Sequence, residues 1–258
     1  MSERPVALIT MATGYVGPEL ARRLAAGGYD LVLQGRSDDG SLVGVEESFD
    51  AQLPALEELG AAVEVVSDVN LLTRGGNRQL VDRALERFGR IDSVCLVTGV
   101  IIIGPFLDMT DDQWDRTKRT NLDMVFHGLQ AVLPPMVAAG SGQVVVFTSA
   151  TGGRPGPMTS IYGGTRAGAN GIVRAVGLEH AADGIQVNAI GTNYMDFPGF
   201  RAATGSDDPE RRARIEAQTP TKRLGTMSEL AAFTSGLLDG SSRFQTGQFF
   251  DYSGGWGA

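Results

Sequence analysis

Three side chains in the second half of the chain have the types and spacing needed for proton transfer. Ser149 ends a β-branched run, and Tyr162 and Arg166 lie four residues apart in a segment of helical period. Residues i and i+4 share one helix face, with Cβ atoms roughly 6 Å apart, so a guanidinium can lie beside a phenol. A positive charge at that distance favours the phenolate, which can accept a proton. Alternatively, the three residues could belong to a helix that is merely packed and solvated.

The positions of these three side chains are set by strands and helices that alternate along the chain. Short β-branched runs predict strands at Val6 to Thr10, Asp30 to Gln34, Val63 to Ser67, Ser93 to Val97, Gly142 to Thr148, Ile185 to Ile190 and Gln248 to Phe250. Apolar residues spaced three and four apart predict helices at Val16 to Ala26, Gly44 to Leu59, Asn70 to Phe88, Thr110 to Val137, Ser160 to Ala182 and Met227 to Leu238. Runs that are apolar at nearly every position are typical of parallel strands buried on both faces. The predicted fold class is therefore α/β, a single Rossmann-like doubly wound parallel sheet of about seven strands with helices on both faces.

The domain organisation follows from what separates these elements. No internal repeat, low-complexity tract or linker divides the 258 residues, so we expect residues 1–258 to form one domain. The least regular stretch, Asp196 to Lys222, contains three prolines and follows the sixth predicted strand. Ligands of open α/β sheets bind beyond the carboxyl ends of the strands, so this stretch is predicted to be a lid over the site.

Composition excludes several classes of function. The chain has 22 Lys and Arg against 30 Asp and Glu, a formal charge of −8, whereas domains that bind nucleic acid are usually basic. One cysteine, Cys95, with only His127 and His180 allows neither an intrachain disulfide nor a Cys/His zinc site, so no metal is expected. The most apolar stretch, Val94 to Ile103, is about half as long as a membrane span, and no secretion signal is evident at the start. We expect a soluble, cytoplasmic protein.

The turn after the first predicted strand is the second informative segment. It reads T-M-A-T-G-Y-V-G and resembles the nucleotide loop of the short-chain dehydrogenase/reductase family, T-G-x-x-x-G-x-G. Glycines let the backbone of such a loop approach a pyrophosphate. Met11 stands at the first glycine and Tyr15 at the second, and only Gly17 remains. The Tyr15 ring is predicted to project into cofactor space, although it could also pack in an ordinary turn between a strand and a helix.

The same family carries S-x12-Y-x3-K, in which the tyrosine is the acid/base and the lysine supports it and holds the nicotinamide ribose. This chain has S-x12-Y-x3-R in Ser149, Tyr162 and Arg166. Arginine keeps the positive charge, but its rigid fork does not replace a lysine in ribose binding.

A third departure follows the sixth predicted strand, where Thr192 and Asn193 stand in place of the Pro-Gly of family reductases. Successive backbone N–H groups in such a turn can form a concavity for an anion. The alternative is a lid hinge with altered turn chemistry.

Together the three departures resemble the halohydrin dehalogenases, a branch of the same superfamily without a nucleotide. Their marks T-x4-F/Y-x-G and S-x12-Y-x3-R both occur here without a gap. The resemblance implies an enzyme without a cofactor that converts vicinal haloalcohols to epoxides, halide and a proton. It also implies epoxide opening by azide, cyanide or nitrite. The segment Ser37 to Phe49 looks most like the G type of this group.

The resemblance also implies roles for individual residues. Tyr162 is the base, Ser149 hydrogen-bonds the substrate oxygen, and Arg166 favours tyrosinate. The residues implied to bind halide or another nucleophile are Tyr15, Thr192, Asn193, Tyr194 and Met195. The implied partners are haloalcohols, epoxides and small anions, with neither nucleic acid nor membrane. A homotetramer built through the helices Thr110 to Val137 and Ser160 to Ala182 is implied as well.

Two other functions remain open. A degenerate NAD(P)-dependent short-chain reductase is one, because Asp68-Val69, Asn121 and Gly35-Arg36 resemble positions that meet the cofactor in this family. It would require the cofactor to bind despite the altered loop. The other is a noncatalytic ligand-binding protein on the same fold, against which the retention of Tyr162 with Arg166 argues.

Overall fold

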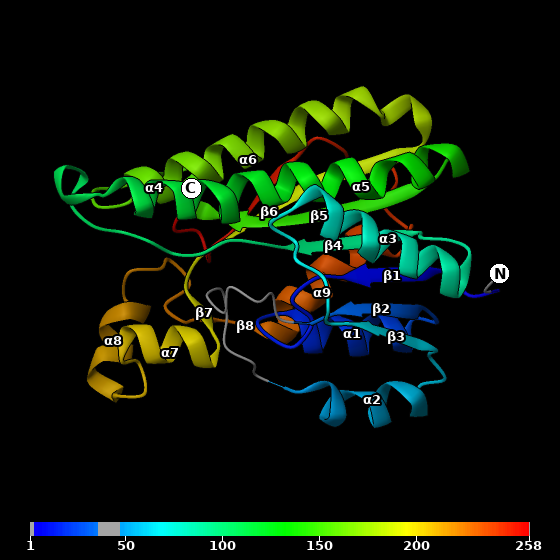
Figure 1. The fold of residues 1–258 in the computed structure, drawn as a ribbon. Coiled ribbons are helices and arrows are strands. Elements are labelled where there is room, and N and C mark those ends of the chain that lie inside the picture. Colours follow the sequence, from blue (N-terminus) through cyan, green and yellow to red (C-terminus); the bar gives the residue numbers. More distant parts are fainter. Residues whose placement is uncertain (1–2, 36–46, 258) are drawn as a thin grey trace.

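A single parallel sheet of seven strands forms the centre of the molecule (Figure 1). The computed structural model describes residues 3–35 and 47–257. The strand order is β3-β2-β1-β4-β5-β6-β9, which reverses between β1 and β4 and so confirms the predicted doubly wound α/β fold. The strands are β1 Val6–Ile9, β2 Asp30–Gln34, β3 Val63–Val66, β4 Ser93–Val97, β5 Gly142–Ser149, β6 Ile185–Thr192 and β9 Phe249–Tyr252.

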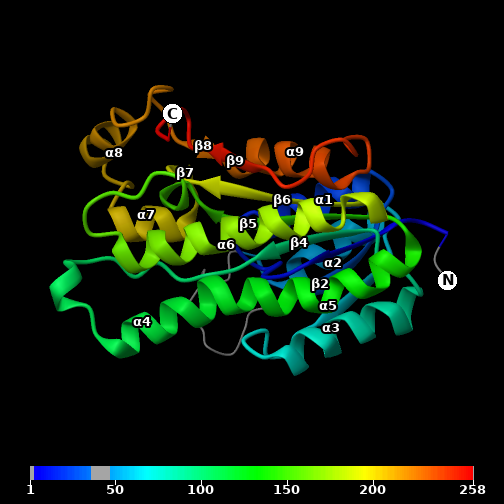
Figure 2. The same cartoon turned by 90° about the horizontal axis from the view of Figure 1, so that it is seen from above.

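Helices cover both faces of the sheet, as Figure 2 shows from above. One apolar core joins the sheet to α3, α5 and α6, and the other joins it to α1, α2 and α9. Alternate residues of β5 enter the two cores, Val144 and Val146 the first, and Val145 and Phe147 the second. The helices are α1 Gly17–Ala26, α2 Phe49–Glu58, α3 Arg74–Phe88, α4 Asp111–Lys118, α5 Met124–Ala139, α6 Ser160–Glu179, α7 Pro198–Thr204, α8 Pro209–Glu216 and α9 Met227–Leu238. Short 3-10 turns lie at Phe106–Asp108, Ala150–Gly152 and Ala181–Asp183.

Two helices begin four or more residues later than the sequence predicts. The helix expected from Asn70 begins at Arg74, because Thr73 caps it by accepting the Gly76 amide at 3.0 Å. The helix expected from Gly44 begins at Phe49 in the described residues, and residues 44–46 lie outside them. Arg36 and most of the segment Ser37 to Phe49, on which the G-type assignment rested, also lie outside the described residues.

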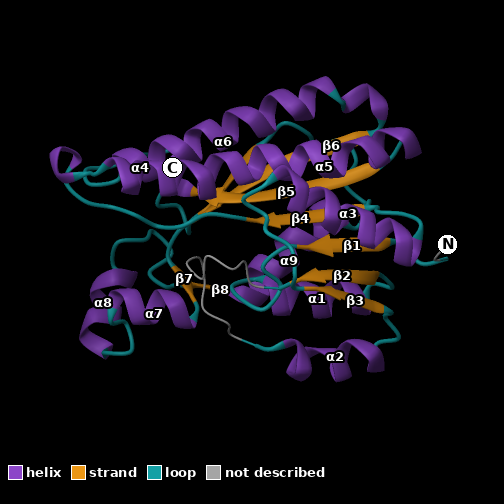
Figure 3. Cartoon of the chain, in the orientation of Figure 1, coloured by secondary structure: helices purple, strands orange, loops and turns teal. Residues whose placement is uncertain are grey.

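The long helix predicted from Thr110 to Val137 runs without a break over Asp111–Ala139 and contains a π turn, Arg119–Asp123, where α4 continues into α5 (both labelled in Figure 3). Such turns occur frequently at functional sites. By length and composition the continuous helical stretch Asp111–Ala139 could cross a membrane, but 44% of its most apolar part is buried inside the molecule. It is therefore consistent with the core helix of a soluble protein, and the cytoplasmic location stays a prediction.

The stretch predicted to be irregular contains two helices, α7 and α8, beyond the carboxyl ends of the strands (Figure 1). Both begin at a proline, which fits the first turn of a helix because its N–H would be unpaired there anyway. A two-residue strand, β7 Met195–Asp196, enters this segment and pairs with β8 Gly225–Thr226.

One carboxylate ties the two helices to the chain that leads into them. Asp196 accepts hydrogen bonds from Arg201 of α7 at 2.8 Å and from Arg212 of α8 at 2.7 Å. Burial alone would raise the pKa of Asp196, but the hydrogen bonds from the two arginines outweigh it and lower the pKa below its ordinary value. Asp196 therefore joins α7 and α8 in its ionised form.

We expect Gly76→Ala to destabilise the protein and Gly75→Ala to do the opposite. A Cβ at Gly76 would lie 2.0 Å from the Asn70 carbonyl oxygen, whereas a Cβ at Gly75 would meet nothing within 4 Å. The clash should lower the free energy of unfolding by roughly 1–3 kcal/mol, while Gly75→Ala should raise it by at most about 1 kcal/mol. Urea unfolding measures both, and equal midpoints for these adjacent variants would contradict the packing of α3.

Asp196→Asn should loosen the lid helices at neutral pH but not in acid. Because folding lowers the pKa of Asp196, its ion pairs stabilise the fold above about pH 4, and this stabilisation is lost as the pH falls below that value. We expect faster trypsin cleavage at the lid arginines and a thermal midpoint lower by about 2–4 °C at pH 7. The difference in midpoint should shrink as the pH falls below about 4 and vanish once Asp196 is protonated in the folded protein. Asp207→Asn, which removes a more exposed carboxylate 3.4 Å from Arg201, is the control and should change less.

Candidate active site

The three residues predicted to transfer a proton lie together where β4 and β5 end. Ser149 is the last residue of β5, and Tyr162 and Arg166 lie in the first two turns of α6. Their exposed fractions are 4%, 7% and 4%. The guanidinium carbon of Arg166 lies 5.5 Å from the centroid of the Tyr162 ring, so the i,i+4 spacing does place a positive charge beside the phenol.

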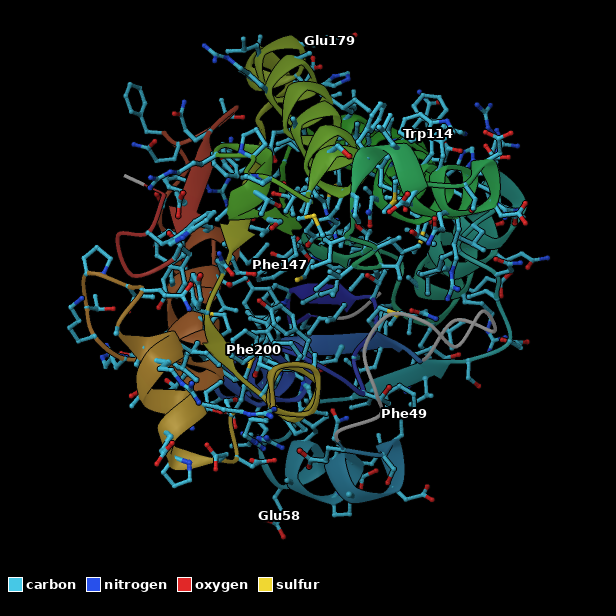
Figure 4. All side chains as sticks on the ribbon, turned by 90° about the vertical axis from the view of Figure 1, so that its left-hand side faces the viewer. Phe49, Glu58, Trp114, Phe147, Glu179 and Phe200 are labelled. Carbon is cyan, nitrogen blue, oxygen red and sulfur yellow. The ribbon has the colours of Figure 1, made fainter. Side chains whose placement is uncertain are left out.

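The Arg166 guanidinium is anchored to the end of the sheet. Its Nη2 donates to the Thr98 carbonyl at 2.6 Å, and its Nη1 donates to Thr98 Oγ1 at 3.2 Å and to the Phe147 carbonyl at 3.4 Å. All three acceptors are neutral, so the guanidinium keeps its full positive charge near Tyr162. Figure 4, which views the molecule from the side where the strands end, shows Phe147 near the middle.

Two residues that sequence reasoning did not assign to the site make room for this anchor. Gly99 has φ +105°, and a Cβ there would lie 1.8 Å from Arg166 Nη2, so only glycine fits. Asn121, in the π turn, accepts the Val100 amide at 2.8 Å and donates to the Val100 carbonyl at 3.0 Å. The signal for Asn121 was its match to the helix asparagine of the family, which sequence reasoning attributed to ancestry. Thr98-Gly99-Val100 was interpreted only as the loss of the family's N-A-G after the fourth strand.

Ser149 and Tyr162 are not hydrogen-bonded to each other. Ser149 Oγ accepts the Thr151 amide at 3.2 Å and the Thr151 hydroxyl at 2.8 Å, which leaves its own proton available to a ligand. The Tyr162 hydroxyl has no hydrogen-bond partner among residues 3–35 and 47–257. A ligand oxygen could thus accept from Ser149 and exchange a proton with Tyr162.

Tyr15 bridges the ends of β1 and β6. Its hydroxyl donates to Thr192 Oγ1 at 2.7 Å, and its ring packs edge-on against Phe147 and Phe197, with centroids 5.7 and 5.0 Å away. Met11 and Tyr15 have φ of +54° and +53°, the left-handed region that favours glycine. The turn therefore keeps a backbone suited to glycine while carrying large side chains.

In the turn predicted to receive an anion, one of the expected backbone N–H donors already has a partner within the protein. Asn193 Oδ1 accepts the Tyr194 amide at 2.9 Å, so this N–H is used within the turn. The Tyr194 ring packs against Phe200 of α7 and Trp256, and burial raises the pKa of Tyr194, whose hydroxyl donates to Gln218 at 2.8 Å. The structure thus places Tyr15 and Thr192 together but turns Tyr194 toward the lid. Met195 lies in the core at 3% exposure.

A nicotinamide nucleotide in the family's usual position does not fit these residues as they stand. The sequence predicts that the Tyr15 ring projects into cofactor space, and in the structure this ring is held against Phe147, Phe197 and Thr192. Arg166 donates to Thr98 and Phe147, so these donors are not turned toward a ribose. Within the described part of the chain, no group of three His, Cys, Asp or Glu side chains could hold a metal ion.

Comparisons with known proteins cover nearly the whole chain. Residues 14–257 match the family model described as Enoyl-(Acyl carrier protein) reductase. Oxidoreductase UcpA of Escherichia coli (strain K12) is 30% identical over 246 residues, which are 93% of this chain and 90% of that protein. The 4-formylbenzenesulfonate dehydrogenase TsaC1/TsaC2 of Comamonas testosteroni is 28% identical and covers 98% and 97% of the two chains. The crystal structure of levodione reductase superposes with a TM-score of 0.86 at 30% identity, over 98% of this chain and 97% of that one.

These relatives overturn the interpretation as a halohydrin dehalogenase. They are named as dehydrogenases, oxidoreductases and reductases, so the predicted lyase activity on haloalcohols and epoxides was wrong. The two motifs misled because each rests on three residues that also have local structural roles. Tyr15 packs among aromatic rings, and Arg166 anchors the end of β4. No finding tests the ligand-binding roles of Tyr15 and Thr192 to Met195, which stay a prediction.

We expect Tyr15→Gly to bind NADH or NADPH at least tenfold more tightly than the wild-type protein. The substitution removes the ring from cofactor space and places glycine at a backbone of positive φ. Wild-type dissociation constants should be weaker than about 100 µM. Tyr15→Phe, which keeps the ring, is the matched control and should resemble wild type. Calorimetric titration measures all three, and equal affinities would show that Tyr15 does not block the nucleotide.

Proposed function

We propose, from the premise that this chain belongs to the short-chain dehydrogenase/reductase family, that it is an oxidoreductase acting on the hydroxyl or carbonyl group of a small molecule. The observation that carries the proposal is the buried Arg166 guanidinium 5.5 Å from the ring of Tyr162. The names of relatives similar over nearly the whole chain support the same class of reaction.

In this proposal Tyr162 moves the proton at the substrate oxygen. Ser149 donates its free proton to that oxygen and holds it beside the phenol. Arg166 stabilises the phenolate form, because a positive charge nearby favours the charged state of an acidic group. Tyr162 protonates the oxygen of a carbonyl substrate and takes the proton from a hydroxyl substrate. Tyr162 supplies or takes only the proton, so the reaction also needs a hydride donor or acceptor. A nicotinamide nucleotide would supply that hydride if it bound, and its binding would require Tyr15 to leave its position against Thr192.

The proposal extends to the organisation of the protein. Residues 1–258 form one domain, and 196–222 cover the substrate as a lid. The family resemblance favours a homotetramer in the cytoplasm, built through α4, α5 and α6. Exposed aromatic side chains on the first two of these helices, Trp114 at 43% and Phe126 at 40%, support an interface there. Figure 4 shows Trp114 at the edge of the molecule.

Tyr162→Phe is expected to lower kcat at least 100-fold while the thermal midpoint stays within a few degrees. The variant keeps the packed ring but removes the only proposed proton-transferring group, and general acid/base catalysis contributes about 10²–10⁴-fold. The assay is a panel of alcohols and ketones, each with the oxidised or reduced forms of both nicotinamide nucleotides. Tyr29→Phe, whose hydroxyl donates to Leu238 in the core, is the control and should retain activity.

Two results would overturn the proposal. Retention of more than a tenth of wild-type turnover by Tyr162→Phe would assign the proton transfer to another group. Release of halide from bromo- or chloroalcohols without nucleotide, together with no turnover of any alcohol or ketone, would show that the chain is not an oxidoreductase.

A further inference from the structure

Three buried polar atoms behind Arg166 have no hydrogen-bond partner. They are Arg166 Nε, Thr148 Oγ1 and Asn170 Oδ1. Arg166 and Thr148 are 4% and 5% exposed. Leaving a buried donor or acceptor unpaired costs about 1–3 kcal/mol, so an unpaired group in a folded protein requires an explanation.

The three atoms belong to side chains that face the same region. Arg166 and Asn170 are i and i+4 on α6 and share one helix face. Thr148 continues the face of β5 on which Val144 and Val146 pack in the core that contains α6. It also follows Phe147, whose carbonyl accepts from Arg166 Nη1.

The backbone at Gly152 lies close to both Asn170 and Arg166. A Cβ at Gly152 would lie 2.8 Å from Asn170 Nδ2 and 3.0 Å from Arg166 Cβ, so the backbone of this turn approaches both side chains closely. The turn Ala150–Gly152 directly follows Ser149. The same few residues therefore carry Ser149 and limit the space available to Asn170.

The unpaired atoms are chemically complementary. Nε–H of an arginine can only donate, Oδ1 of an asparagine can only accept, and a threonine hydroxyl does both. A single buried water typically makes about three hydrogen bonds. One donor, one acceptor and one hydroxyl can thus be satisfied together, either by a small rotation of Asn170 or through one shared water.

We propose that Asn170, with Thr148, is a positioning residue for Arg166. Asn170 Oδ1 takes the Nε–H, directly or through a water that Thr148 also binds. This contact fixes the plane of the guanidinium, whose Nη1 and Nη2 hold Thr98 and whose charge lies beside Tyr162. The catalytic part of this inference rests on the proposed function, whereas the contact itself does not.

The contact is tested first in the wild-type protein and in Asn170→Leu by crystallography at a resolution that shows ordered water. We expect Arg166 Nε within about 3.2 Å of Asn170 Oδ1, or of a water that also reaches Oδ1 and Thr148 Oγ1. In Asn170→Leu we expect the guanidinium to rotate. A wild-type Nε bonded to any other group would overturn the proposal, whatever reaction the enzyme catalyses.

The catalytic consequence is tested by a double-mutant cycle with Arg166→Gln. Asn170→Leu alone should lower kcat about tenfold with little change in KM, and should move the acidic limb of the pH–rate profile to higher pH. In the Arg166→Gln background it should have no further effect, because the group that it positions is gone. Asn170→Asp, which keeps the acceptor, should restore the position of the guanidinium. Glu179→Gln, at the exposed end of the same helix, should leave kcat and the pH profile unchanged.

Thr148→Val covers the case in which Asn170→Leu does not fold. It removes only the hydroxyl and keeps the shape of the side chain, and it should give a smaller change of the same sign in kcat and pH profile. Additive effects of Asn170→Leu, or of Thr148→Val, with Arg166→Gln would refute the positioning role.

Discussion

The burial of one positive charge, the Arg166 guanidinium, is the constraint on which the catalytic end of the sheet depends. A charge removed from water is costly unless hydrogen bonds replace its hydration. Here the replacement comes from backbone and hydroxyl oxygens at the ends of β4 and β5. Gly99 must lack a side chain for the guanidinium to reach Thr98, and the π turn must bring Asn121 to Val100 so that the loop after β4 stays in place. The ends of β4 and β5 and the loop after β4 thus all contact the buried Arg166 guanidinium or make room for it.

A second constraint lies at the ends of β1 and β6, where Tyr15 bonds to Thr192. Met11, Tyr15 and Tyr194 adopt positive φ, and such residues persist only where surrounding contacts compensate the strain. Tyr15 obtains that compensation from Thr192 and two phenylalanines. The turn after β1 is therefore held by an aromatic side chain, at a position where the family's loop motif has glycine. Whether the turn after β1 holds only the Tyr15 ring or can also admit a nucleotide therefore depends on this one side chain.

Much of the fold could be predicted from sequence because its signals are local. The apolar runs of the strands and the spacing of the helices gave boundaries that agree within a few residues, and the proximity of Tyr162 and Arg166 follows from helical geometry. The π turn at Arg119–Asp123 could not be predicted, because it accompanies the hydrogen bonds between Asn121 and Val100, 21 residues away. The lid helices were missed because Pro198 and Pro209 look like breaks, although a proline also starts a helix well. Thr98 is adjacent to Arg166 only in the folded chain.

The names of the relatives contradict the predicted reaction, and the structure shows how little a short motif says about a reaction. A three-residue motif reports which side chains can lie near one another; here Arg166 lies beside Tyr162, and Ser149 is the last residue of β5. It does not report which groups remain free for a ligand. The Tyr194 amide, expected to receive a halide, is already bonded to Asn193, whereas the Ser149 proton and the Tyr162 hydroxyl are available. The available groups can bind and protonate an oxygen, which a haloalcohol offers as well as a ketone or alcohol, so they do not distinguish the two reactions. The names of the relatives similar over nearly the whole chain make that distinction.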